Sequence, residues 1–339
     1  MDPEIDWWTW HHEPATKTIW LQDHFGSFDY RFRNYFLDLI PDGYTVYSEY
    51  QFPEEVHRAY PQLQLKFSAW LWLYANRIWP ISDTANLLAR PSNRRQTFLS
   101  AFFRSNQPER HGIMAMLNDR GWFNPDFCSK HFELDPEQLI RLGIEYDQVD
   151  PNFATTIVKH DFVSPGDHVH NLQTLSEIIQ SSFVHFVVET KAWDTTVCFP
   201  TEKFLYAVAN RTLWLATAPP NYHKMINQQF GFRLHSCFDY FFDSRWEQRD
   251  RLSLLLEQFQ QFSKYTPAQW QQIYAAEQDT LEYNYQRLAS MEFFDHVVRS
   301  DQELGITPEP PNKRYTSTCK PVLDRYQQIK ASVGSNLAK

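Results

Sequence analysis

The residues with the clearest capacity for chemistry lie in the middle of the chain, from Glu189 to Lys203. Glu189 ends a run of β-favouring residues, and Thr201, Glu202 and Lys203 open the helical pattern that follows. A helix N-terminus presents unpaired backbone N–H groups and a partial positive charge, both of which favour a phosphate. Lys203 adds a full charge that can meet a pyrophosphate oxygen, and the Glu202 carboxylate can accept hydrogen bonds from both hydroxyls of a ribose. The pattern predicts a binding site for a nucleoside diphosphate.

The same residues also have a purely structural explanation, and both explanations stay open. An acidic residue such as Glu202 in the first turn stabilises its helix, and Lys203 can be a solvated surface charge. The stretch lacks the glycines that are typical of phosphate-binding loops. Glycines are unnecessary, however, if the backbone does not wrap the phosphates tightly.

The surrounding pattern predicts the elements that must position these residues. Helices are expected at 172–182, 201–211 and 221–229, and strands at 183–190, 213–219 and 232–238. This alternation is the rhythm of a parallel, doubly wound sheet, in which ligands bind beyond the carboxyl ends of the strands. Glu189 and the start of the next helix should therefore face the same crevice.

The first half of the chain mixes strands with helices, and the last part is helical. We expect strands within 17–28 and 44–50, a buried helix at 63–79, a strand or short helix at 93–103, a helix at 108–122 and amphipathic helices from 246 onward. Turn-forming residues gather at 150–170. The expected organisation is an N-terminal α/β domain over 1–165, a nucleotide-binding α/β domain with trailing helices over 166–300, and a C-terminal tail over 301–339.

Composition narrows the class of protein. The chain has 339 residues, 42% hydrophobic and 17% aromatic, which indicates a globular protein with a large core. The net charge of −9 argues against nucleic acid as a general partner. The four cysteines are far apart and form no CxxC pair, which favours reduced thiols over disulfides or zinc. With neither a signal-peptide pattern nor a transmembrane segment in the sequence, we expect a soluble, cytoplasmic protein.

Several strings in the second half resemble a known family. FVVET, followed by PTEKFLYAVANRTLWLATAPPNYHKMINQQFGF, resembles the donor-binding half of glycosyltransferases of the α1,3/4-fucosyltransferase type and their viral and bacterial relatives. The match extends from near Phe183 to just past Phe242. Downstream, FDYFFDSRWEQR and EYNYQRL are similar to later segments of the same relatives.

The resemblance implies a GT-B architecture, with two Rossmann-like domains facing a cleft. It makes Glu202 and Lys203 contacts of the donor nucleotide and aligns Glu189 with a family acid. Thr190 and Lys191 stand where the family has Asn and Ser, so the donor can be GDP- or UDP-linked. The implied reaction uses a nucleotide sugar as substrate, needs no metal or other cofactor, and modifies a glycan or glycoconjugate acceptor. The N-terminal domain would hold that acceptor.

Direct displacement needs a group that takes the acceptor proton. Asp23 and His24, after the first strand, are candidates for this base, and Glu49, near the end of the second, is another. Each is also an ordinary turn or surface residue by its position.

Two further groups of residues have weaker functional interpretations. His160, His168, His170, Asp161 and Asp167 could suggest a metal, but their spacing on a turn-rich segment favours solvated polar residues, so we expect no metal site. Four arginines concentrate positive charge in the first half: Arg94, Arg95, Arg104 and Arg110. One of these could reach the donor phosphates, although surface salt bridges explain them as well.

The sequence therefore predicts a glycosyltransferase. The alternatives are a non-catalytic protein that binds a sugar nucleotide or glycan on the same fold, and a structural assembly protein that binds no nucleotide.

Overall fold

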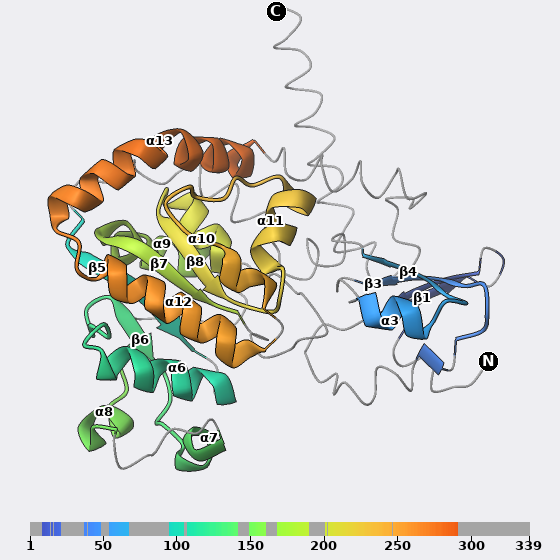
Figure 1. Ribbon diagram of the computed structural model, residues 1–339, viewed down its shortest axis with the longest axis horizontal. Helices are drawn as coiled ribbons and strands as arrows, with labels where there is room; N and C mark the ends of the chain where they lie inside the picture. Colours follow the sequence, from blue (N-terminus) through green and yellow to red (C-terminus); the bar gives the residue numbers. More distant parts are fainter. Residues whose placement is uncertain are drawn as a thin grey trace, which may run out of the picture. The chain divides into compact units, whose positions relative to one another are not determined.

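A computed structural model describes thirteen stretches of the chain. They are residues 9–13, 15, 17–21, 37–38, 40–48, 54–67, 95–104, 107–141, 149–160, 168–189, 201, 203–245 and 247–290. Two compact units divide the chain between them: one holds the described residues up to 67, the other those from 95 to 290 (Figure 1). Both units are α/β structures built on sheets with parallel strands.

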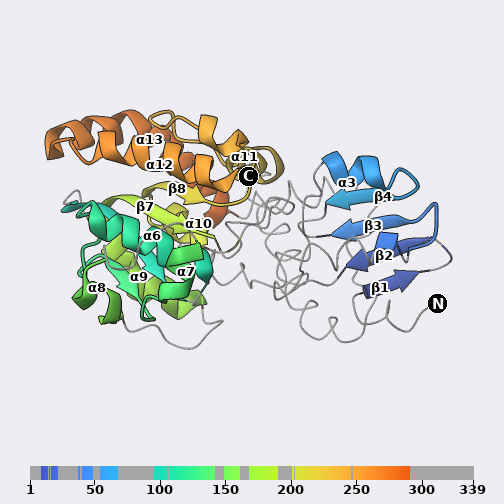
Figure 2. The same cartoon turned by 60° about the horizontal axis from the view of Figure 1, so that its bottom comes forward.

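The first unit is a four-stranded sheet with one helix described beside it (Figure 2). Its elements are β1 (Thr9–Glu13), β2 (Thr18–Leu21), β3 (Thr45–Ser48), α3 (Glu54–Ala59) and β4 (Gln64–Phe67). The strand order is β1-β2-β3-β4; β1 is antiparallel to β2, and the other pairs are parallel. Ile19, Val46 and Leu65 are buried in its core, against which Val56 of α3 packs.

The sequence predicted β2 and β3 correctly, but β4 was wrongly expected to begin a helix. Leu63 and Leu65 are buried while Gln64 is exposed, which is the period-two alternation of a strand. The long apolar run after Phe67 made the whole stretch look like a buried helix, although its first residues alternate as a strand does. Residues 68–79, the rest of that expected helix, lie outside the described part.

The second unit contains the sheet β6-β5-β7-β8, all of whose described pairings are parallel. Its strands are β5 (Thr97–Phe103), β6 (Cys128–Lys130), β7 (Ser182–Val188) and β8 (Leu213–Thr217). The chain runs from β5 to β6 at one side, then returns to the other side of β5 to form β7 and β8. This reversal makes the sheet doubly wound, with its switch point between β5 and β7.

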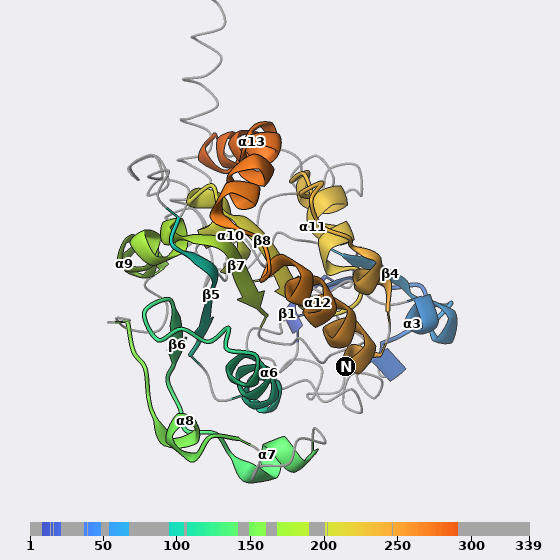
Figure 3. The same cartoon turned by 60° about the vertical axis from the view of Figure 1, so that its left-hand side comes forward.

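Helices cover both faces of this sheet (Figures 1 and 3). They are α6 (Pro108–Asp119), α7 (Pro136–Arg141), α8 (Pro151–Thr155), α9 (His168–Ser181), α10 (Lys203–Ala209), α11 (Tyr222–Phe230), the short 3-10 helix η2 (Phe241–Ser244), α12 (Gln248–Phe262) and α13 (Pro267–Ala289). Leu99, Ala101 and Phe186 of the strands share one core cluster with Ile113 of α6 and Leu255 of α12. The alternate strand residues face α9 and α10, because successive strand side chains point to opposite faces.

The last described helix, α13, contacts both β7 and the irregular segment after α11. Trp270 of α13 stacks on Phe183 at a ring-centroid distance of 5.2 Å. Glu277 accepts hydrogen bonds from the Ser236 hydroxyl and the Cys237 backbone N–H, and it also bonds His235. Burial opposes ionisation of Glu277, but these hydrogen bonds outweigh it and lower its pKa to about 2. The helix is therefore anchored at two points.

The expected domain boundary at 165/166 needs a correction, because it falls inside one unit. β5 and β6 precede it and β7 and β8 follow it, yet the four strands form one sheet. The boundary between the two units lies instead between residues 67 and 95. The expected strand at 232–238 is irregular backbone without strand pairing.

The other expected elements of the second unit are confirmed, from α6 through β7, α10, β8 and α11 to α12 and α13. Among the described helices, none combines the length and the apolar character needed to cross a membrane.

Candidate functional site

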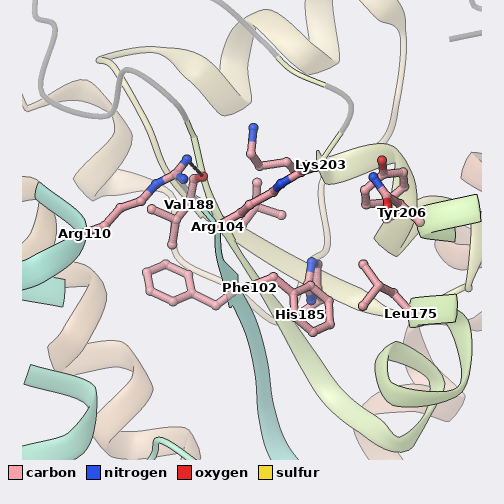
Figure 4. Close-up of a pocket in the computed structure, with 11 residues that line it drawn as sticks. Phe102, Arg104, Arg110, Leu175, His185, Val188, Lys203 and Tyr206 are labelled. Carbon is pink, nitrogen blue, oxygen red and sulfur yellow. Dashed lines mark hydrogen bonds between the residues drawn. The ribbon is translucent and has the colours of Figure 1, made fainter. Parts of the chain in front are cut away.

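A pocket opens at the carboxyl ends of β5 and β7, with a volume of about 70 Å³ (Figure 4). Phe102 and Arg104 come from the end of β5, and Val187 and Val188 from the end of β7. The remaining walls come from α6, α9 and α10. Since β5 and β7 flank the switch point, the pocket lies where doubly wound sheets bind their ligands.

Three cations converge on this pocket: Arg104 after β5, Arg110 in the first turn of α6, and Lys203 at the start of α10. Figure 4 shows them toward one end of the pocket, with Phe102, His185 and Leu175 toward the other. We call the three cations the cationic rim and the opposite end the floor.

The three cations are held differently. The Arg110 side chain is buried, and its guanidinium donates to the Val188 carbonyl at 3.4 Å. Arg104 is half-buried and makes no hydrogen bond or ion pair with any residue in the described part of the chain. The Lys203 ammonium donates to Thr201 Oγ1 at 2.8 Å and lies 3.7 Å from Glu189 Oε2. Among the described carboxylates, Glu189 lies beside Lys203.

Glu189 lies behind the pocket and holds its parts together. The side chain is completely buried, and its oxygens accept from the Thr201 backbone N–H at 3.0 Å and the Thr201 hydroxyl at 2.5 Å. The Tyr222 hydroxyl donates to Oε1 at 2.5 Å. These bonds tie the end of β7 to the start of α10 and so position Lys203. Neither Glu189 nor Thr201 lines the pocket.

The floor combines apolar groups with the polar His185. His185 on β7 bonds Ser100 Oγ through its Nδ1 at 2.9 Å. Burial lowers the pKa of His185 to about 3, so its imidazole is neutral at physiological pH. Asn171 of α9 is 6% exposed and lines the same pocket. The pocket thus offers positive charge at its rim, a neutral imidazole at its floor and an amide in its wall.

A buried carboxyl also lies close to the rim. Glu109 precedes Arg110 in the first turn of α6 and is 5% exposed. Burial raises its pKa to about 6, although its own backbone N–H and the Arg110 charge act in the opposite direction. Its charge therefore changes near neutral pH, beside one of the rim cations.

Of the four arginines singled out in the sequence, Arg104 and Arg110 reach the pocket and Arg95 does not. Arg95 lies at the amino end of the sheet, where it donates to the carbonyls of Gln180, Ser182 and Arg211. Its guanidinium also lies 4.0 Å from the Tyr274 ring centroid. Arg95 is therefore a structural clamp at the opposite end of the strands. Arg94 lies outside the described residues.

Several predicted site residues also lie outside the described part of the chain: Asp23, His24, Glu49, Thr190 and Glu202. Asp23 and His24 follow β2 in sequence, and Glu49 directly follows β3. Because β2 and β3 are parallel neighbours, their carboxyl ends lie at the same edge of their sheet. The donor-binding and base assignments of these five residues stay predictions.

The histidine and aspartate cluster is described only in part. His160 bonds the Cys128 carbonyl at 3.1 Å, and His170 bonds Thr174 Oγ1 at 3.1 Å. Asp161, Asp167 and the side chain of His168 are not described. Within the described stretches, no three His, Cys, Asp or Glu side chains gather as a metal site would require.

Sequence reasoning named only Arg104, Arg110 and Lys203 among the lining residues; those that it missed include Phe102, Asn171, His185 and Tyr206. A signal existed for one of them, because His185 interrupts the apolar run of β7, where burial of a polar side chain needs a reason. Asn171 and Tyr206 lie on helical patterns whose inward faces become a pocket wall only when the sheet order is known.

Comparisons of the chain with protein-family models, with curated proteins and with solved structures give no significant match in any of the three.

Proposed function

We propose that the chain is a glycosyltransferase of the GT-B type, which binds a nucleotide sugar at the switch-point pocket and transfers the sugar to a glycan or glycoconjugate. The observation that carries the proposal is the convergence of Arg104, Arg110 and Lys203 on one pocket of a doubly wound sheet. Lys203 is the residue that the resemblance to fucosyltransferases aligns with a donor contact. The two arginines add to it a charge distribution that suits a diphosphate.

In the proposed reaction, an acceptor hydroxyl oxygen forms a bond to the anomeric carbon while the bond from that carbon to the diphosphate oxygen breaks. The acceptor proton passes to a base, for which Asp23, His24 and Glu49 are the candidates. Negative charge develops on the departing diphosphate, and the cationic rim would stabilise it. Glu202 and Thr190 are proposed contacts of the donor, with Glu202 on the ribose.

Binding is the first test. We would measure dissociation constants of UDP-, GDP-, dTDP- and CMP-sugars by calorimetry, with thermal shift as a screen. Lys203→Ala and Arg104→Ala should each weaken binding of the preferred nucleotide about tenfold or more, because each removes a charge-assisted contact. Arg249→Ala is the matched control, since Arg249 is an exposed cation on α12 away from the pocket, and it should leave binding unchanged.

A measurement of turnover then distinguishes a glycosyltransferase from a non-catalytic protein that only binds the nucleotide sugar. Release of the nucleoside diphosphate in the presence of a glycan acceptor would support sugar transfer. Tight nucleotide binding without turnover on any acceptor would favour the non-catalytic sugar-nucleotide-binding protein. Failure of every nucleotide to bind the parent protein would overturn the proposal and leave a structural role.

A further inference from the structure

The hydrogen bonds beneath the pocket favour one arrangement of protons around His185. The Ser182 hydroxyl lies 2.9 Å from the Ile179 carbonyl, and when it donates to that carbonyl it accepts in its 2.8 Å bond with Ser100. Ser100 then donates to Ser182 and accepts from His185 Nδ1 at 2.9 Å. In this arrangement the neutral imidazole carries its proton on Nδ1 and a lone pair on Nε2.

The His185 side chain lines the pocket, and the described residues supply no donor to its Nε2. The Asn171 side chain lines the same pocket, and its Oδ1 is buried without a hydrogen-bond partner in the described stretches. A buried polar atom such as this Oδ1 costs free energy when it has no partner, and a bound ligand can recover that cost.

We propose that the floor of the pocket is a recognition subsite for a hydroxyl or amino group of the ligand, which donates a hydrogen bond to His185 Nε2 and contacts the Asn171 amide. The inference deepens the proposed function and rests on it, because it assigns the ligand a phosphate at the cationic rim and a hydrogen-bond donor at the floor. A ligand that offers only phosphate oxygens cannot donate a hydrogen bond to Nε2 and gains nothing from His185.

Phe102 and Leu175 add apolar walls beside His185. The floor therefore suits the edge of a ligand that combines a donor group with apolar surface.

A matched pair of substitutions at one position tests the proposal. Asn can reproduce the Nδ1 bond to Ser100 but lacks an atom at the Nε2 position, whereas Gln can reach the Nε2 position but lacks the Nδ1 bond. His185→Asn should weaken binding of the preferred nucleotide sugar about tenfold, and His185→Gln should retain most of it. Inorganic pyrophosphate, which has no alcohol hydroxyl or N–H group, should bind both variants and the parent equally.

Asn171→Leu provides a second variant if His185→Asn does not fold. It should weaken nucleoside diphosphate binding about threefold to tenfold, with no effect on pyrophosphate. Nitrogen-15 spectra of histidine-labelled parent protein test the same point without any substitution. They should show the Nδ1–H tautomer of His185, and the Nε2 resonance should shift when the nucleotide binds.

The source of the donor group is resolved by changing the ligand. If a ribose hydroxyl is the donor, the 2′-deoxy nucleotide should bind the parent more weakly and lose its sensitivity to His185→Asn. If the transferred sugar supplies it, the effect of His185→Asn should appear only with the intact nucleotide sugar. An effect of His185→Asn that is present with the nucleoside diphosphate and survives removal of both the 2′- and the 3′-hydroxyl assigns the donor to an N–H group of the base.

Failure of the floor subsite and failure of the proposed function give different experimental results. Equal nucleotide affinities of the parent, His185→Asn and Asn171→Leu would overturn the floor subsite while leaving the proposed function standing. Absence of binding of every nucleotide and of pyrophosphate to the parent would overturn both.

Discussion

Glu189 is a buried carboxylate that lies beside the switch-point pocket without lining it. It is completely buried, and its oxygens are occupied by Thr201 and Tyr222, with the Lys203 ammonium nearby. A buried carboxylate in such surroundings stabilises the structure only while its partners remain. Its described contacts position Lys203, and they account for an acid at the end of β7.

Replacement of Glu189 should therefore damage stability before it damages binding. Glu189→Ala leaves the Thr201 donors, the Tyr222 hydroxyl and the Lys203 charge without their acceptor, and should lower the free energy of unfolding by about 3–5 kcal/mol. Tyr222→Phe removes a single hydrogen bond and should cost about 1 kcal/mol. Urea denaturation measures both. If Glu189→Ala kept its stability but lost nucleotide binding, Glu189 would be a ligand contact instead.

The sequence predicts the part of the candidate site whose residues are neighbours in the chain. It misses the residues that only the folded sheet brings together. Lys203 was found because a helix start directly follows a strand and a loop, which is a local pattern. Arg104 and Arg110 could only be named as cations, since their approach to Lys203 depends on β5 lying next to β7. His185 was hidden inside an apolar run, and its hydrogen bond to Ser100 joins positions that are distant in sequence.

At the scale of elements, the junction between α11 and the irregular segment after it depends on one glycine. Gly231 ends α11 with a φ of 69°, in the left-handed region. A Cβ at this position would lie 2.5 Å from a guanidinium nitrogen of Arg287, whose Nε donates to the Phe230 carbonyl at 2.7 Å. The helix end and α13 therefore meet at a position without room for a side chain.

Gly231→Ala should be markedly more destabilising than the same change at Gly121. Both glycines have a left-handed φ, which costs a non-glycine residue about 1–2 kcal/mol. Gly121 has no atom within 4 Å of an added Cβ, so Gly121→Ala should show the backbone cost alone. Gly231→Ala should lose about 1–3 kcal/mol more through overpacking against Arg287. Equal unfolding free energies of the two variants would show that Arg287 moves aside freely.

The elements themselves were largely predictable, because periodicity and end signals are local properties. α6 begins at a proline and is followed closely by Gly121, and α11 stops at Gly231, as their sequences indicated. The domain boundary was wrong for the opposite reason: strand order is a long-range property, and turn-forming residues at 150–170 connect elements within one sheet. β4 was missed because its alternating residues run into a longer apolar stretch.

At the scale of the whole molecule, the net charge of −9 coexists with a concentrated group of cations. An acidic chain repels polyanions such as nucleic acid, yet a pocket needs only a few local charges to hold a small anion. The composition therefore restricts the kind of anion, and the pocket specifies where it would bind. The restriction favours small phosphorylated ligands over polymers.

The second unit should fold and bind nucleotide by itself. Its core cluster and every residue that lines the pocket belong to the unit that spans Asn76–His296. A protein of residues 76–296 should unfold cooperatively, because a domain with its own core folds independently. Its affinity for the preferred nucleotide should match that of the full chain within about threefold, a difference of less than about 1 kcal/mol. Calorimetry and thermal melting measure both properties; an aggregated fragment, or a much weaker affinity, would show that residues of the other unit are required.

The hydrogen bonds between Glu189 and Thr201 also affect which changes of sequence the protein can tolerate. They join two positions separated by twelve residues, so the sheet and α10 are fixed whatever the length of the chain between them. Closing a longer loop costs little, about 0.6 kcal/mol for each doubling of its length. Insertions and exchanges between these positions should therefore be tolerated in evolution and in engineering. New ligand preferences could arise there while the cationic rim and the floor stay as they are.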